Sequence, residues 1–131
     1  MQSWFYDPLG LTVNSVKNSV DWYWNGTQIV NFVTCGWEYF WLSQTSWALQ
    51  ENDAYCAINL TPNPTSGDSS SFVHYKNGVF CLGFDTHTWY DRNTARGDQV
   101  GTLWGFASWR WSGFCATAFL DIGYTIQRTL N

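Results

Sequence analysis

Hydrophobic and polar residues alternate along most of the chain, and turn-forming residues interrupt this alternation about every eight to twelve positions. Alternation with a period of two is typical of β-strands with one buried face, whereas an amphipathic helix repeats its apolar residues at spacings of three and four. We find no convincing helix. The clearest strand covers 114–126, in which every second residue is apolar, and Gly123 is expected to mark a β-bulge there. The pattern predicts an all-β fold of about nine or ten short antiparallel strands.

Two Asn-Gly pairs are expected to form tight hairpin turns. Asn25-Gly26 separates a strand at 19–25 from a strand at 27–34, and Asn77-Gly78 closes a second hairpin. Asn-Gly favours a type I′ turn because both central residues need positive φ. Further strands are expected at 11–13, 36–42, 54–60, 85–91 and 100–107, with polar loops or turns at 61–71, 92–99 and 108–113. We expect these strands to pack as an antiparallel β-sandwich, with a closed up-and-down β-barrel as the alternative.

The run from Cys35 to Trp47 is the richest in aromatic residues and holds three of the ten tryptophans. A strand at 36–42 would place Trp37, Tyr39 and Trp41 on one face. Because the run begins with a cysteine and follows a hairpin that is apolar on both faces, we expect a central strand tethered by a disulfide, with these three rings in the core. Trp47, at the end of the run, stays a candidate for ligand contact.

Length and charge narrow the class of protein. At 131 residues the chain has the size of one domain, so we expect a single all-β domain over 1–131. A formal net charge of −4, with lysines and arginines scattered singly, argues against nucleic acid and against an anionic membrane surface. Since no run of about 18 apolar residues occurs, we also expect no membrane insertion.

The four cysteines are expected to form two disulfides. They include no Cys-x-x-Cys pair and have no histidine at the spacing of a zinc site, so we expect no metal and no other cofactor. Three connectivities are possible, and we favour Cys35–Cys56 with Cys81–Cys115. Disulfides form in oxidising compartments, which predicts a secreted, extracellular protein.

The nearest approach to a catalytic cluster is Asp85, His87 and Asp91, which a strand would point to one side. A carboxylate could orient the imidazole as a general base, or the set could bind a cation. No motif for a serine or cysteine nucleophile accompanies it. We therefore favour a solvated strand face. The carboxylates of Glu38, Glu51 and Asp53 show no spacing that selects a pair for glycoside cleavage.

The tripeptide Arg96-Gly97-Asp98 spells the integrin-recognition sequence within an expected polar loop. A tripeptide carries little information, and glycine is common in turns. We favour the view that Gly97 is a turn residue over integrin binding.

The tryptophans give the leading functional hypothesis, because a core of this size can absorb only part of them. Exposed aromatic rings stack on the apolar faces of sugars while polar neighbours bind the hydroxyl groups. The candidate ligand-binding residues are Trp47, Trp89, Trp109, Arg110 and Trp111. The alternative for Trp109 and Trp111 is that they plug one end of the fold.

Three functions stay open from the sequence. The first is a secreted, non-catalytic module that binds carbohydrate or another polymer. The second is a secreted protein-interaction component, such as an inhibitor, a toxin subunit or a surface-assembly protein, because tryptophan, tyrosine and arginine dominate protein interfaces. The third is a small secreted hydrolase that uses Asp85, His87 and Asp91. We favour binding over catalysis.

Overall fold

The computed structural model describes residues 1–30, 33–59 and 65–128, which form eight β-strands and two short helical segments. Neither helical segment is long and apolar enough to cross a membrane. The strands are β1 (Gln2–Tyr6), β2 (Thr12–Asp21), β3 (Thr34–Trp41), β4 (Trp47–Asn59), β5 (Ser66–Cys81), β6 (Phe84–Asp98), β7 (Leu103–Ser112) and β8 (Asp121–Thr125), and the helical segments are the 3-10 turn η1 (Ser43–Thr45) and the helix α1 (Ala116–Phe119).

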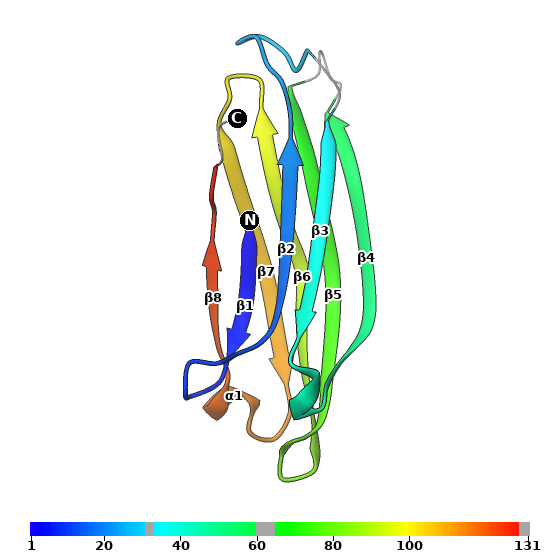
Figure 1. The fold of residues 1–131 in the computed structure, drawn as a ribbon, viewed down its shortest axis with the longest axis vertical. Helices are drawn as coiled ribbons and strands as arrows, with labels where there is room; N and C mark the ends of the chain where they lie inside the picture. Colours follow the sequence, from blue (N-terminus) through cyan, green and yellow to red (C-terminus); the bar gives the residue numbers. More distant parts are fainter. Residues whose placement is uncertain (31–32, 60–64, 129–131) are drawn as a thin grey trace.

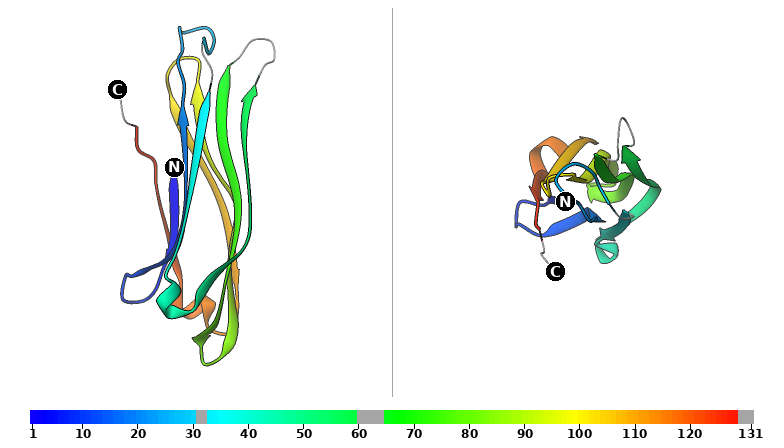
Figure 2. Two further views of the ribbon diagram at one scale, coloured as in Figure 1. Left: turned by 45° about the vertical axis from the view of Figure 1, so that its right-hand side comes forward. Right: turned by 90° about the horizontal axis from the view of Figure 1, so that it is seen from above.

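The strands form two antiparallel sheets that lie face to face along the long axis of an elongated molecule (Figures 1 and 2). The first sheet has the order β3-β2-β1-β8 and the second sheet the order β4-β5-β6-β7. The expected antiparallel sandwich is confirmed. The alternative of a closed barrel is wrong, because in the described part of the chain each sheet ends in two open edge strands.

The strands are fewer and longer than expected, because polar segments that we expected to be loops continue the second sheet. Residues 66–71 belong to β5 and residues 92–98 to β6, while 60–64 lie outside the described residues. Several of these polar side chains point between the sheets, where hydrogen bonds replace those that water would have made. The polar residues of these two segments therefore belong to strands and partly fill the space between the sheets; they do not form loops.

A hydrogen-bonded network of buried polar side chains crosses the middle of the sandwich. Ser3 Oγ donates to Asn93 Oδ1 at 2.7 Å, and Asn93 Nδ2 donates to Asn18 Oδ1 at 2.7 Å. Ser71 Oγ donates to the same Asn18 oxygen at 2.8 Å. The network separates two apolar clusters: Ser3 lies between Met1 and Phe5, Asn18 between Val16 and Val20, and Asn93 between Tyr90 and Ala95.

The prediction of a hairpin turn at Asn77-Gly78 is wrong, because β5 continues past these residues to a turn at Leu82 and Gly83. Both turn residues have positive φ, 55° and 86°, as a type I′ turn requires. Asn77 instead forms a bulge in which its Oδ1 accepts the backbone N–H groups of Val79 and Phe80, each at 2.8 Å. The Asn77 side-chain amide therefore stabilises a bulge within β5 and does not form a hairpin turn.

The Asn25-Gly26 turn exists, but it is wider than a two-residue hairpin. Trp24 pairs with Ile29, which leaves four residues in the loop. The Asn25 Oδ1 atom accepts the backbone N–H groups of Thr27 and Gln28, each at 3.0 Å. Of the expected strand at 27–34, residues 31–32 lie outside the described residues.

The expected strand at 114–126 is wrong in its first half, which contains α1. Ala116 and Leu120 are both buried against the apolar core. Their spacing of four residues suits a helical turn as well as alternation does, so the pattern was ambiguous there. Gly123 lies in β8 in regular register with β1, and the expected bulge is absent from this ladder.

The segment from Cys35 to Trp47 does not form a central strand, because β3 is an edge strand of the first sheet. Trp37 and Trp41 are 41% and 37% exposed at this edge, while Tyr39 packs against the core. The expected Cys35–Cys56 disulfide is present and joins β3 to β4, the neighbouring edge of the second sheet. It is the one disulfide among the described side chains, where two were expected; the side chain of Cys81 lies outside the described part, so the Cys81–Cys115 bridge stays a prediction.

Candidate functional site

The structure places three of the expected ligand-binding tryptophans inside the sandwich. Trp47 is 1% exposed and belongs to the apolar core. Trp109 and Trp111 alternate with exposed residues along β7 and pack against the same core, because residues 108–112 continue the strand and do not form a turn. The ring of Trp111 makes an edge contact with Phe5 at 5.9 Å between centroids. Trp47 therefore offers no surface to a ligand, whereas Trp109 and Trp111 are partly buried and contribute to the packing of the fold.

Trp89 and Arg110 lie together on the outer face of the second sheet, where they form a stacked row with His74. The centroids of His74 and Trp89 are 4.7 Å apart and their planes differ by 11°. The Arg110 guanidinium lies 4.1 Å from the centroid of Trp89. These neighbours sit on adjacent strands in direct register, so the stacking repeats at the strand spacing. The Trp89 ring is already covered by its neighbours and is a poor platform for a sugar.

The expected catalytic cluster is divided among separate partners. Asp85 forms an ion pair with Lys76 at 2.7 Å, and Asp91 forms one with Arg110 at 3.0 Å. His87 Nδ1 lies 2.9 Å from His74 Nε2, so one imidazole donates to the other. The carboxylates therefore neutralise cations and do not orient the imidazole.

The two histidines offer limited chemistry. Burial, followed by the neighbouring His87, lowers the pKa of His74 below its usual value. Within the described residues, no serine or threonine hydroxyl is hydrogen-bonded to either ring, and no three side chains of His, Cys, Asp or Glu are placed to share a metal ion. This arrangement suits a structural stack better than nucleophilic or metal-assisted catalysis.

The remaining carboxylates that we considered lie on two different sheets. Glu38 is on β3 and forms an ion pair with Lys17 at 2.8 Å. Glu51 and Asp53 lie on β4, opposite His74 and Phe72 of β5. Glu38 is thus already neutralised by a cation and shares no sheet with Glu51 and Asp53.

The Arg96-Gly97-Asp98 tripeptide lies in β6, and its side chains have partners within the protein. The Arg96 guanidinium donates two hydrogen bonds of 2.6 Å to the Asp68 carboxylate. The indole of Trp22 lies directly over Gly97, where a side chain would collide with it. Asp98 accepts backbone N–H groups of the following turn and an indole N–H. Gly97 allows close packing and is not a turn residue as we expected.

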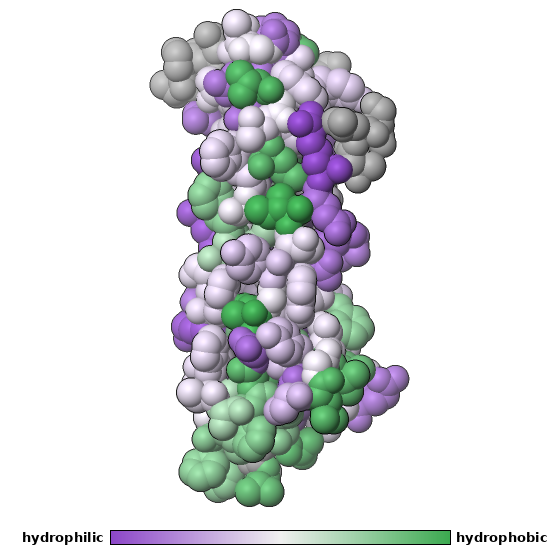
Figure 3. Space-filling model, turned by 90° about the vertical axis from the view of Figure 1, so that its left-hand side faces the viewer, coloured by the Kyte–Doolittle hydropathy of each residue, from purple (hydrophilic) through white to green (hydrophobic). Residues whose placement is uncertain are grey.

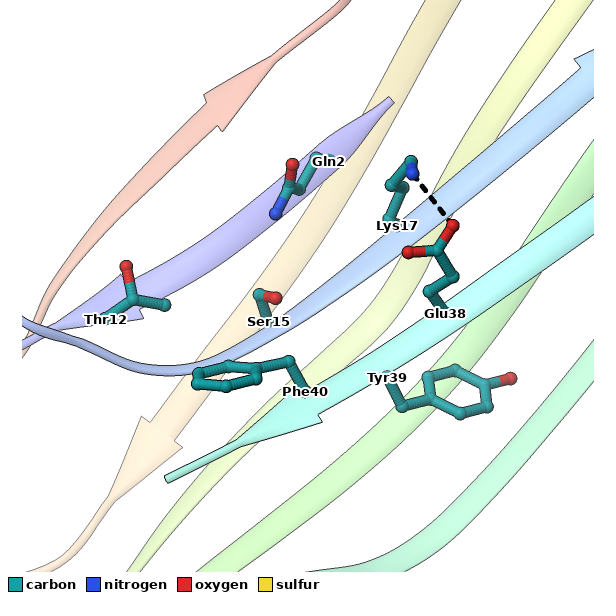
Figure 4. A pocket seen from close by; sticks show the side chains of 7 residues that line it. All are labelled: Gln2, Thr12, Ser15, Lys17, Glu38, Tyr39 and Phe40. Carbon is teal, nitrogen blue, oxygen red and sulfur yellow. Dashed lines mark hydrogen bonds and ion pairs between the residues drawn. The ribbon is translucent and has the colours of Figure 1, made fainter. Parts of the chain in front are cut away.

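A pocket of about 410 Å³ opens on the outer face of the first sheet (Figure 4). Gln2 of β1, Lys17 of β2 and Glu38 of β3 lie side by side in one row across the strands. Ser15 and Phe40 lie in the next row. Tyr39 also borders the pocket, but its ring points away from that of Phe40 and packs against the core. The pocket combines an exposed aromatic ring with amide, hydroxyl and charged groups. Its lining residues are Gln2, Thr12, Ser15, Lys17, Glu38, Tyr39 and Phe40.

Trp4 extends this surface by one strand. It pairs with Ser15 on one side and with Gly123 of β8 on the other. A Cβ added to Gly123 would lie 2.5 to 2.7 Å from three adjacent indole atoms of Trp4, so the face of the ring lies on the glycine. The ring therefore leans toward β8, and Ser15, between Trp4 and Phe40, is itself buried. Phe40, Ser15, Trp4 and Gly123 thus form one row across all four strands.

The polar groups around this row are held in place by neighbours. The ion pair of Lys17 and Glu38 lies in the adjacent row, next to Gln2. A hydrogen bond to Asp121 raises the pKa of Tyr6, which lies beyond Trp4 on β1. The carboxylate of Asp121 also accepts the Ile122 backbone N–H at 2.8 Å.

This surface is absent from the sequence predictions, because they include no strand at 2–6. The signal was present: Gln2, Trp4 and Tyr6 alternate with Ser3 and Phe5, which are buried. A segment of five residues before Asp7-Pro8 is short, and its pairing with the far end of the chain cannot be read locally. No known protein family matches this chain, and neither the curated proteins nor the solved structures include a match.

Proposed function

We propose that the protein is a non-catalytic module that binds a carbohydrate chain or a similar polymer on the outer face of the first sheet. The observation that carries this proposal is the Trp4 ring, which lies flat on Gly123 in the same row as Ser15 and Phe40. A ring that lies along the surface can stack on the apolar face of a sugar, because its own face meets the ligand.

The spacing of the row suits an extended ligand. Trp4 and Phe40 are two strands apart, which corresponds to about 9.5 Å between their backbones. Ser15 lies between them, and the groups of Gln2, Lys17 and Glu38 form a parallel polar row. A chain lying across the strands could contact both rings, and its hydroxyl groups could donate hydrogen bonds to Glu38 and accept them from Lys17 and from the Gln2 amide. The pocket is open, which favours a polymer over a small enclosed ligand.

Binding is a better account of this surface than catalysis. The carboxylate at the pocket, Glu38, is paired with Lys17, whereas glycoside hydrolysis needs two carboxylates on either side of the bond. Secretion belongs to the same proposal, since the Cys35–Cys56 disulfide fits an oxidising compartment.

The test is sedimentation of the protein with insoluble cellulose, chitin and peptidoglycan, together with quenching of tryptophan fluorescence. We expect Trp4→Ala and Phe40→Ala each to weaken binding by about tenfold, since a lost stacking contact of about 1.4 kcal/mol has this effect. Trp104→Ala and Phe106→Ala are matched controls, because both residues are exposed on the outer face of the second sheet.

Thermal unfolding of each variant would show that the fold is retained. Equal binding by all four variants would contradict the proposal, as would a loss confined to Trp104→Ala and Phe106→Ala. Failure of the wild-type protein to bind any polymer, combined with a stable complex with another protein that Trp4→Ala disrupts, would instead favour an interaction component.

A further inference from the structure

Apolar side chains from three distant segments gather at one end of the molecule. In Figure 1 this is the lower end, formed by the β1–β2 loop, the β5–β6 hairpin and the link from β7 to β8, and Figure 3 shows the apolar surface concentrated there. We name this surface the apolar tip. Its exposed residues are Leu9, Leu11, Val79, Leu82, Phe84, Phe114 and Phe119.

Leu82 indicates that the apolar tip has a role outside folding. It occupies the first central position of the β5–β6 turn with φ of 55°, a conformation that disfavours residues with a branched or bulky side chain. Its side chain is 88% exposed and therefore contributes little to the core. Glycine or asparagine would fit the turn with less strain. A strained and exposed leucine is best explained by a contact with a partner.

The charges next to the apolar tip are already satisfied. Asp7 Oδ1 accepts the backbone N–H groups of Leu9 and Leu11, each at 2.9 Å. Asp85 is paired with Lys76. No lysine or arginine occurs in the sequence of the three segments, 7–11, 79–84 and 113–119, and anionic lipids require such residues. The apolar tip therefore offers apolar groups and no cation of its own, which does not match an anionic surface.

The shape of the apolar tip favours a fluid partner over a rigid one. Its side chains project from three separate loops, and the rings of Phe84 and Phe114, 5.5 Å apart, hold two of these loops together. A lipid surface can close around separate projecting groups, whereas a protein would need a groove of matching shape. We infer that the apolar tip inserts into the interfacial region of a bilayer of zwitterionic phospholipids, with the long axis of the sandwich rising from the surface.

This inference differs from our expectation of no membrane insertion. That expectation rested on the absence of a long apolar run and on the net charge, which concern spanning segments and anionic surfaces. The apolar tip is assembled by the fold from residues as far apart as Leu9 and Phe119, so no window of the sequence reveals it.

The experiment is co-sedimentation of the full chain with phosphatidylcholine vesicles, and with the same vesicles containing added phosphatidylserine. We expect binding to pure phosphatidylcholine that changes little with salt. The double variant Leu82→Asn, Phe114→Ser should bind about tenfold more weakly, since two apolar groups lose their burial. Val100→Asn is the matched control, because Val100 is an exposed apolar residue in the β6–β7 loop at the opposite end.

Several results would overturn the inference. One is the absence of binding to phosphatidylcholine; another is binding that needs phosphatidylserine and is released by salt. Unchanged binding by the double variant would also overturn it. A wild-type dimer in light scattering that the double variant abolishes would identify a second copy as the occupant. Because Trp4→Ala leaves the apolar tip intact, its effect on polymer binding and not on vesicles separates this test from that of the proposed function.

Discussion

The indole ring of Trp4 lies on the backbone of Gly123, across the ladder between β1 and β8. A Cβ at residue 123 would come within 2.5 Å of the Trp4 Cε2 atom, so this orientation of the ring depends on the glycine. The relationship joins the two ends of the chain, since these residues are far apart in sequence and adjacent in the first sheet. It also determines which face of the ring points away from the sheet.

Gly123→Ala should therefore weaken polymer binding several-fold although residue 123 itself contributes no side chain to the ligand. The added methyl group forces the Trp4 ring to turn away from the surface. Gly36→Ala is the matched control in the same sheet, because its new methyl group meets only the flexible Ser19 hydroxyl. Sedimentation with the bound polysaccharide measures the effect. Equal binding by the two variants would show that the orientation of Trp4 is unimportant.

A second prediction compares how much Trp41 and Trp47 each contribute to the free energy of unfolding. Trp47→Ala should reduce the free energy of unfolding by about 3–5 kcal/mol, as expected for a large side chain removed from a core. Trp41→Ala should cost about 1–2 kcal/mol, because this ring is 37% exposed at the edge of the first sheet. Urea denaturation of both variants would test the order. A larger loss for Trp41→Ala would mean that the edge of β3 is more tightly packed than the exposure indicates.

The alternation of residues predicted which side chains share a face more reliably than it predicted where strands end. Trp37, Tyr39 and Trp41 do lie on one side of β3, in register with the inward-facing residues of β2, and His87 and Trp89 do point outward together. Alternation could not show that β3 is an edge strand, because edge or centre is decided by pairing with distant segments. For the same reason, alternation could not show that Trp37 and Trp41 are partly exposed to solvent.

Polar residues gave the largest errors, because their role depends on whether partners are available. Ser71 and Asn93 lie in polar segments that suggest loops, yet each is buried and hydrogen-bonded between the sheets. Only the folded arrangement supplies those partners, including Asn18 from the other sheet. The proposed binding surface is absent from the sequence predictions for a similar reason, since the orientation of the Trp4 ring depends on Gly123 at the other end of the chain.

A third prediction concerns the pH dependence of stability. The pKa of His74 is lowered by burial and by His87; the facing Glu51 carboxylate opposes this shift, while the cations Arg110 and Lys76 add to it. The unfolded chain then binds more protons than the folded chain below about pH 6.5, so this stabilising contribution is complete above that pH and is lost as the pH falls below it.

His74→Gln should flatten this dependence, since glutamine does not titrate. The comparison is the urea midpoint of the wild-type protein and the variant at about pH 7.5 and about pH 5.5. The wild-type protein should lose more stability between these values than the variant. An equal loss would place the responsible groups elsewhere.

The last prediction is that one substitution at Leu82 raises the stability of the fold and weakens binding to vesicles. Leu82→Asn should raise the free energy of unfolding by about 0.5–1 kcal/mol, because asparagine tolerates the left-handed conformation that the turn imposes on leucine. The same change should weaken binding to phosphatidylcholine vesicles, because it removes the most exposed leucine of the apolar tip. Chemical denaturation and vesicle sedimentation measure the two effects on one protein. If Leu82→Asn instead destabilised the fold, the leucine would hold a packing contact, and its exposure at the turn would no longer indicate a partner.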